Sequence, residues 1–272
     1  MLGIVNLTED SFSDGGRYLD PAAALAHARA LAAAGADIID LGAAASNVAA
    51  KPVAADEEIR RLDPVIVALM ADGIPVSVDS FRLDVQRFAI SRGVAFLNDI
   101  QGFPDQSFYP ELAAAECRLI VMHAAQGHGR AQRLELSADD VWARIEAFFA
   151  ERITALEHAG IAHQRLVIDP GMGLFLSSRP EASLHVLNRL DRLKRRFGVP
   201  VLVSVSRKSF LRALTGSTSA AELGPATLAA ELFAAENGAD FIRTHEPGAL
   251  VQGLAVVAAL AAERAPSSRP AP

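Results

Sequence analysis

The sequence predicts a single α/β barrel in which eight parallel strands alternate with helices. A repeated pattern supports this fold class: a helix, a glycine, a short apolar strand and then a polar residue. In each repeat the glycine stands where a helix ends and a left-handed residue is favoured, and the apolar run has the length of a buried parallel strand. The repeats are Ala34–Gly42, Asp72–Ser80, Arg92–Asp99, Phe197–Ser206 and Asn237–His245.

Three further apolar segments bring the number of predicted strands to eight, at Leu2–Asn6, Cys117–His123 and Arg165–Gly171. The expected alternative is a doubly wound open sheet. That fold usually carries a glycine-rich phosphate loop of the form GxGxxG after its first strand, and none follows Asn6. The strand count and the absent loop therefore favour the closed barrel.

The helices between these strands have recognisable beginnings. Asp20 followed by Pro21 is typical of an N-cap and a first helical residue, and Ser137 with Asp140 resembles a capping box. Acidic residues at 56–58 suit the positive end of a helix dipole. No long linker interrupts the alternation, so residues 1–272 are predicted to form one domain, with 265–272 as a frayed tail.

Composition excludes several classes of function. The net charge is −6 and 51% of the 272 residues are hydrophobic, which indicates a large core but no basic face for nucleic acid or anionic membranes. The amino-terminal residues lack the basic and apolar regions of a signal peptide, so a cytoplasmic protein is expected. The single cysteine, Cys117, is interpreted as a small buried apolar residue. No metal-binding motif is present, so any metal would be Mg²⁺ shared with a phosphate.

One segment, Val203–Phe210, combines a strand end with two serines, an arginine and a lysine where a helix would begin. Such a junction is a natural anion site, because backbone N–H groups and the helix dipole both point at the ligand. A lysine in the first turn opposes the dipole, so Lys208 calls for a functional reason. The segment predicts that an anionic group binds here.

Polar residues at the strand ends are the candidate functional residues, because the chemistry of α/β barrels lies at the carboxyl ends of the strands. Nearly every predicted strand runs into a group that donates, accepts or carries charge. Ordinary loop residues would be more varied, so the set predicts a polar pocket. These groups are Asn6, Asp40, Asp79, Asn98, Asp99, His123, Asp169, Ser206, Lys208, Arg243 and His245.

Each of these residues also has a structural explanation. Asp79 and Asp169 could be helix caps or turn residues, and His123 is more often a satisfied core histidine than a catalyst. Arg243 and His245 share one face of a strand, as a structural ion pair would. The residue types alone leave both explanations open.

The loop after the first strand, Leu7–Asp20, is long for a connection from strand to helix. It is rich in Ser, Asp and Gly and carries the aromatic Phe12 at its tip. A lid over an active site has this composition, whereas an ordinary surface loop is less prone to expose a phenylalanine.

Six motifs in this order resemble the dihydropteroate synthase family over essentially the whole chain. The motifs are GIVNLTEDSFSDGG (3–16), SVDS (77–80), LNDI (97–100), VIDPGMG (167–173), SRKSF (206–210) and IRTH (242–245). The resemblance implies an α/β barrel that joins 7,8-dihydropterin-6-ylmethyl diphosphate to 4-aminobenzoate with Mg²⁺, giving 7,8-dihydropteroate and diphosphate. It also implies a homodimer.

The resemblance also implies roles for single residues. Asp79, Asp169 and Lys208 are the expected catalytic residues. The expected pterin contacts are Asp79, Asn98, Met122, Asp169, Lys208 and Arg243. The aminobenzoate contacts are Ser206, Phe12, Ser46 and Leu174, and the diphosphate contacts are Asn6, Arg243 and His245, with Asn6 also at the metal. No covalent intermediate is needed, which fits the absence of a nucleophilic triad.

The chain departs from the family pattern after the second strand. Where most members carry an arginine and a proline it has Asn47 and Val48, with Lys51 as a candidate replacement cation. These departures resemble the mobile, sulfonamide-resistant branch of the family. In that branch an aromatic residue follows the GMG motif, whereas here Leu174 stands at that position, with Phe175 next. The hypothesis is intermediate or full sulfonamide resistance, with Leu174 as the departure that speaks against it.

Two other functions compete with the synthase. A barrel that transfers a methyl group from methyltetrahydrofolate to a corrinoid would also bind a pterin, but it needs neither a diphosphate cradle nor a benzoate site. A pterin-binding protein without activity is suggested by the lost arginine at position 47. Diphosphate release that depends on aminobenzoate and Mg²⁺ separates these alternatives.

Overall fold

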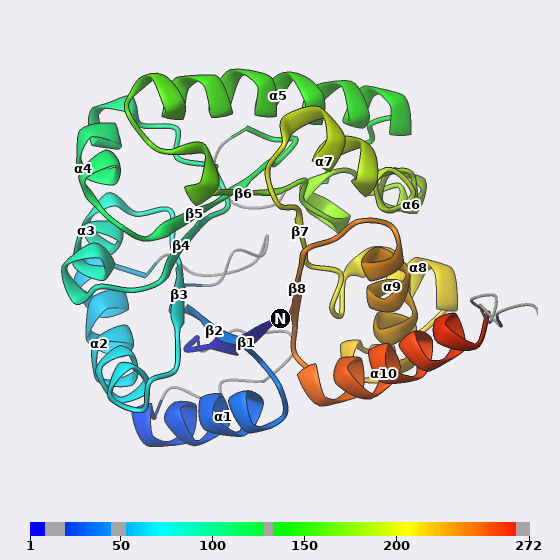
Figure 1. The fold of residues 1–272 in the computed structure, drawn as a ribbon, viewed down its shortest axis with the longest axis horizontal. Helices are drawn as coiled ribbons and strands as arrows, with labels where there is room; N and C mark the ends of the chain where they lie inside the picture. The colour runs from blue at the N-terminus through cyan, green and yellow to red at the C-terminus, as the bar shows by residue number, and fades with distance from the viewer. Residues whose placement is uncertain (9–19, 45–52, 128–132, 265–272) are drawn as a thin grey trace, which may run out of the picture.

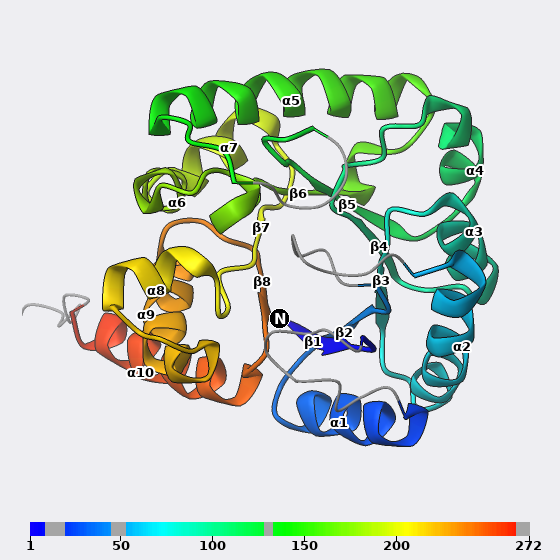
Figure 2. The same cartoon turned by 180° about the vertical axis from the view of Figure 1, so that it is seen from behind.

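A computed structural model describes residues 1–8, 20–44, 53–127 and 133–264. Figure 1 shows a ring of strands with helices around it, and Figure 2 shows the same ring from behind. The strands are β1 Leu2–Asn6, β2 Ile38–Gly42, β3 Val76–Asp79, β4 Phe96–Asp99, β5 Arg118–Met122, β6 Leu166–Asp169, β7 Leu202–Val203 and β8 Phe241–Thr244. The predicted barrel is therefore confirmed.

The helices are α1 Pro21–Ala33, α2 Ala55–Ala71, α3 Leu83–Arg92, α4 Tyr109–Ala114, α5 Ala138–His158, α6 Pro180–Leu187, α7 Leu190–Phe197, α8 Ser209–Thr215, α9 Gly224–Glu236 and α10 Pro247–Arg264. Two connections differ from the single helix that was expected after each strand. Both α6 and α7 follow β6, and both α8 and α9 follow β7. No helix in the described part of the chain combines the length and the apolar composition that a membrane crossing requires.

All strand pairs are parallel, in the order β6-β5-β4-β3-β2-β1-β8-β7. The pairing of β1 with both β2 and β8 rules out the doubly wound alternative. A single bridge between Ile168 and Val201 joins the ends of the sheet, β6 and β7. The barrel is thus nearly closed, and the carboxyl ends of all eight strands face one mouth.

The sequence signals at the helix ends act as predicted. Asp20 accepts hydrogen bonds from the N–H groups of Ala22 and Ala23 at the start of α1, and Ser137 accepts one from Asp140 N–H at the start of α5. The five glycines of the repeats all have φ between 67° and 105°, which a residue with a side chain rarely adopts. Each helix therefore stops where the next strand must begin.

The period of two along each strand separates two environments. One set of side chains packs outward against the helices, as Val76, Val78 and Leu97 do. The other set faces the barrel interior, where an apolar cluster fills the amino-terminal end: Leu2, Ile38, Phe96, Ile120, Val167 and Leu202. Further along the strands the inward residues become polar. The apolar cluster is therefore a floor beneath a polar site.

Candidate active site

A small pocket lies at the carboxyl ends of the strands. It is lined by Asp79, Asn98, Ile100, Met122, Asp169, Gly171, Met172, Phe175, Ser204, Lys208 and Arg243. All six residues that the family resemblance assigned to a pterin line it, although they come from six different strands or strand ends. The hollow measures about 30 Å³. This is about the room that one or two waters occupy.

The side of the pocket at β4, β5 and β6 combines polar groups with an apolar wall. Asn98 and Asp169 are only 4% and 3% exposed, and Met122 packs with Phe175 beside them. One oxygen of Asp169 accepts a hydrogen bond of 2.8 Å from Gly171 N–H. Burial raises the pKa of Asp169 to about 6, against the Gly171 hydrogen bond and the Lys208 charge. This carboxyl group is therefore poised to titrate near neutral pH.

His123 follows β5 and is 3% exposed. Its Nδ1 lies 3.2 Å from the Pro170 carbonyl oxygen, and burial lowers its pKa to about 4. A neutral, buried and hydrogen-bonded imidazole is what the structural explanation predicts. His123 is thus a core residue behind the pocket wall.

Lys208 enters the pocket from the turn just before α8, so a helix begins within one residue of the predicted position. The helix α8 begins at Ser209, so Lys208 is its N-cap and Ser206 lies three residues before the helix. The intervening Arg207 has φ 58°, and its N–H donates to Thr227 Oγ1 at 3.1 Å. This left-handed residue, rather than a helix start, directs Ser206 and Lys208 to the barrel mouth.

The Lys208 ammonium group lies 5.0 Å from the centre of the Phe175 ring. Burial lowers the pKa of Lys208 to about 8, and Arg243 adds to this effect, while Asp169 and Asp79 oppose it. Lys208 is therefore a cation at neutral pH that loses its proton under mildly alkaline conditions.

Arg243 joins two carboxylates across the barrel. Its Nε donates to Asp40 at 2.5 Å and its Nη2 donates to Asp79 at 2.8 Å. Although burial alone would lower it, the pKa of Arg243 is raised by these two carboxylates. Burial raises the pKa of Asp79 to about 7, against the attraction of Arg243. Arg243 thus forms an ion pair, but with Asp40 and Asp79 rather than with His245.

Ser206 and His245 form a pair at the rim of the pocket. Ser206 Oγ lies 2.8 Å from His245 Nδ1 and accepts a hydrogen bond of 3.3 Å from His245 N–H. Burial lowers the pKa of His245 well below its usual value, and the cations Arg207 and Arg243 add to this effect. His245 is therefore neutral, and the residues assigned to aminobenzoate and to diphosphate are in direct contact.

Asn6 ends β1, next to β2, and its amide oxygen lies on the same side of Gly42 as a carboxylate oxygen of Asp79. A Cβ at Gly42 would lie 3.8 Å from Asn6 Oδ1 and 3.9 Å from Asp79 Oδ2. Amide and carboxylate oxygens suit Mg²⁺, which keeps several water or phosphate ligands. Within the described ranges no group of three His, Cys, Asp or Glu side chains could hold a metal. The residues present therefore fit a Mg²⁺ that takes most of its ligands from diphosphate and water.

Several predicted residues lie outside the described parts of the chain. They include the aminobenzoate candidates Phe12 and Ser46, the departures Asn47 and Val48, and Lys51. The fourth aminobenzoate candidate, Leu174, is half-buried and packs beside Met122 and Phe175. It lies next to the pocket without lining it.

Several residues of the site received no role from the sequence, among them Gly171 and Met172 of the GMG motif, which line the pocket. Ser204, Ile100 and Phe175 line the pocket, and Asp40 holds Arg243 from below. Ser204 could have been found from the period of two, since it shares a strand face with Ser206. Asp40 was noticed as a strand-end carboxylate but received no role. Ile100 and Phe175 lie in loops that carry no such period.

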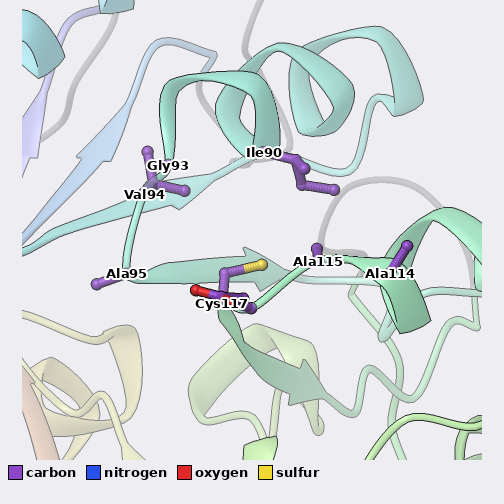
Figure 3. Close-up of a pocket in the computed structure, with 8 residues that line it drawn as sticks. Ile90, Gly93, Val94, Ala95, Ala114, Ala115 and Cys117 are labelled. Atoms are coloured by element: carbon purple, nitrogen blue, oxygen red, sulfur yellow. The ribbon is translucent and has the colours of Figure 1, made fainter.

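A second hollow, of about 460 Å³, lies at the opposite end of the barrel, where α3 leads to β4 and α4 leads to β5. Figure 3 shows its lining of small and apolar residues, including Ile90, Ala115 and Cys117. Burial raises the pKa of the Cys117 thiol, which makes it unreactive. The larger hollow thus lacks the convergent polar groups of the smaller one, and Cys117 is a small buried residue, as expected.

Comparisons with known proteins agree with this geometry. A family model described as pterin binding enzyme matches residues 2–245. The chain is 62% identical over 260 residues to the dihydropteroate synthase type-2 of Escherichia coli, covering 96% of this chain and 95% of that protein.

Two solved structures resemble the model. The Xanthomonas albilineans dihydropteroate synthase with 4-aminobenzoic acid has a TM-score of 0.86 at 38% identity, over 96% of this chain and 92% of that one. The Yersinia pestis dihydropteroate synthase in a sulfonamide drug complex has a TM-score of 0.86 at 30% identity, over 96% of this chain and 94% of that one. The chain therefore belongs to the dihydropteroate synthase family.

Proposed function

We propose that this chain acts as a dihydropteroate synthase in folate biosynthesis, joining 7,8-dihydropterin-6-ylmethyl diphosphate to 4-aminobenzoate. The observation that carries the proposal is the pocket, where the inward residues of six strands or strand ends supply the donors and acceptors that a pterin ring requires. Family membership supports the same activity.

Each side chain has a part in this reaction. The Asn98 amide would donate and accept along the edge of the pterin, and the carboxylates of Asp79 and Asp169 would accept from its N–H groups, while Met122 covers its face. Lys208 would donate to a pterin acceptor, and Arg243 would lie between the ring and the diphosphate. The site thus orients the methylene carbon toward the barrel mouth.

The proposed chemistry is a dissociative substitution at that carbon. The bond to the bridging oxygen breaks with its electron pair on diphosphate, and the pterin carries the developing positive charge. Asp79 and Asp169 balance this charge, and Asn6, Arg243 and His245 stabilise the leaving diphosphate. The aniline nitrogen then forms the new C–N bond and releases one proton.

We propose that Asn6 holds Mg²⁺ together with the diphosphate. The shared position of Asn6 Oδ1 and Asp79 Oδ2 beside Gly42, within 3.8 Å and 3.9 Å of one point, supports this assignment. The ion supplies charge neutralisation for the diphosphate when it is bound. The protein's part is to hold one amide oxygen at the point where β1 ends, beside the strand that carries Arg243.

We assign the aminobenzoate site to Ser206, Leu174, Phe12 and Ser46. Ser206 is 5% exposed and lies beside His245, so its hydroxyl group stands between the two proposed anionic groups. The Xanthomonas albilineans relative is described with 4-aminobenzoic acid, which supports a carboxylate site in a barrel of this shape.

The experiment that tests the function measures diphosphate release by the purified protein. Release is expected to require both 4-aminobenzoate and Mg²⁺, and to stop when a chelator is added. Lys208→Ala and Asp169→Ala should each lower turnover by about 100-fold or more, because each removes a charged group at the reacting centre.

Lys194→Ala is the matched control for Lys208→Ala. Lys194 pairs with Asp240 at the amino-terminal end of β8, away from the pocket, so its variant should keep full turnover. Circular dichroism would check that all variants fold. Wild-type turnover in Lys208→Ala would show that the site is misplaced, and pterin binding without diphosphate release would leave a binding protein.

The pH dependence of turnover follows from the pocket's pKa values. Asp169 and Asp79 must both be ionised, and since their pKa values are about 6 and about 7, the higher value places the acid limb near pH 7. Lys208 must be protonated, and its pKa of about 8 places the alkaline limb there. The measurement is kcat/KM for the pterin diphosphate against pH, which reports the free enzyme. Lys208→Arg should remove the alkaline limb, and an unchanged limb would contradict the assignment.

We propose that the enzyme resists sulfonamides. A sulfonamide extends beyond the aminobenzoate site, so a side chain at the rim can exclude it at little cost to the substrate. Inhibition by sulfamethoxazole should be at least 10-fold weaker than for the Yersinia pestis enzyme, which is described in a sulfonamide drug complex. Leu174→Phe should weaken inhibition further, and Leu174→Ala should strengthen it. Equal inhibition constants for the two enzymes would refute resistance.

We also propose that the chain forms a homodimer through its outer helices. Val256 and Leu260 on α10 are 60% and 57% exposed, and Phe233 on the adjoining α9 is 39% exposed. A row of exposed apolar residues is typical of an interface. Light scattering should give twice the chain mass for the wild type and the single mass for Leu260→Glu. A monomeric wild type would exclude the proposal.

A further inference from the structure

The carboxylate of Asp40 lies below the pocket, where no ligand can reach it. Asp40 is the third residue of β2 and is 0% exposed. It pairs in register with Ile4 of β1 and with Ser77 of β3. Asp79 lies two residues beyond Ser77 and is 20% exposed at the pocket. The Asp40 carboxylate is therefore fully buried, whereas the Asp79 carboxylate lies at the pocket surface.

Arg243 connects these two carboxylates. Its Nε donates to Asp40 Oδ2, and its Nη2 donates to Asp79 Oδ2. The other Asp40 oxygen, Oδ1, has no hydrogen-bond partner among the described residues. Asp40 therefore caps no helix and bonds no backbone N–H group in this part of the chain. Its role depends on Arg243.

Folding alone does not account for a carboxylate at this position. Taking a carboxylate out of water is costly, and replacing a buried ion pair by apolar side chains is often neutral or stabilising. Ile4, the register neighbour on β1, is an apolar residue that is 2% exposed. An aliphatic side chain would thus suit the same layer.

The charges of the pocket indicate what Asp40 contributes. Three carboxylates, Asp40, Asp79 and Asp169, face two cations, Lys208 and Arg243. A pterin that bonds to Asp79 competes with Arg243 for that carboxylate. If Asp79 were the one counter-ion of Arg243, a pterin that took Asp79 would leave the guanidinium group with the diphosphate alone, and the departure of diphosphate would leave a buried cation unpaired, at a high cost in free energy.

We propose that Asp40 is a positioning residue: it remains the counter-ion of Arg243 while Arg243 releases Asp79 to the pterin and turns its other N–H groups to the diphosphate. The guanidinium group has five N–H donors, of which the two carboxylates occupy one each. The hydrogen bond from Nε to Asp40 fixes the side chain from below. The guanidinium group can therefore exchange Asp79 for the diphosphate without leaving the site. This inference rests on the proposed function and adds a residue that does not touch the substrate.

The test is a double-mutant cycle with Asp40→Asn and Arg243→Met. Asp40→Asn keeps the shape but removes the charge, so kcat/KM for the pterin diphosphate should fall at least 10-fold while KM for 4-aminobenzoate changes less than 2-fold. In the Arg243→Met background the same substitution should change kcat/KM less than 2-fold, because the partner is already absent. In that background Asp40→Asn should also raise the melting temperature, because it removes a buried carboxylate that has lost its partner.

Ser77→Ala is the matched control, since it removes the neighbouring buried polar atom of the same layer without touching Arg243, and it should keep full activity. Three results would overturn the proposal. Asp40→Asn could lower kcat/KM equally in the wild-type and Arg243→Met backgrounds, it could change the kinetic constants of both substrates equally, or it could leave the wild-type kinetics unchanged.

Calorimetric binding of the pterin diphosphate separates this inference from the proposed function. A wild-type protein that binds the pterin diphosphate without turnover would count against the function alone. The Asp40→Asn change in Kd would then test the inference, with a loss of at least 10-fold expected. An unchanged Kd, or no binding by the wild type, would overturn it.

Discussion

Closure of the parallel sheet is the constraint on which the rest of the structure depends. β1 pairs with β2 on one side and β8 on the other, so strands from the two ends of the chain become neighbours. This pairing carries Arg243 to within hydrogen-bonding distance of Asp40, which lies 203 residues earlier. An open sheet with the same helices would leave these side chains at separate edges. The pocket therefore depends first on the order in which the strands pair, and only then on the local sequence of each strand.

Within the closed sheet, the period of two decides what the interior can contain. The first inward residues of the strands are apolar and form the floor. The next inward residues are charged or polar, and the buried carboxylates of Asp40 and Asp79 are compensated by their ion pairs with Arg243. The floor excludes water from below, which strengthens the electrostatic interactions above it. The same burial moves the pKa values of Asp79, Asp169 and Lys208 toward neutrality.

Much of this arrangement could be predicted from the sequence, because strand positions and inward faces follow from local periodicity. The first strand was predicted at its observed bounds, and all six proposed pterin residues line one pocket. The left-handed turn at Arg207 could not be predicted, since Arg207 is held by Thr227 from another helix. The role of Asp40 was also hidden, because its partner is remote in sequence. Local sequence patterns determine where helices and strands form, whereas side-chain contacts between remote residues depend on how the barrel closes.

The small size of the pocket has a physical explanation in these partners. Arg243 bonds to Asp79, and Lys208 lies over Phe175, so side chains of the site contact one another around the pocket. These pairings matter because the charges are buried, and a buried charge without a partner is costly. In the proposed function, substrate binding replaces contacts between these side chains by contacts with the ligand. Affinity depends on the difference between the two sets, which is why a fixed counter-ion beneath Arg243 matters more than another contact to the ring.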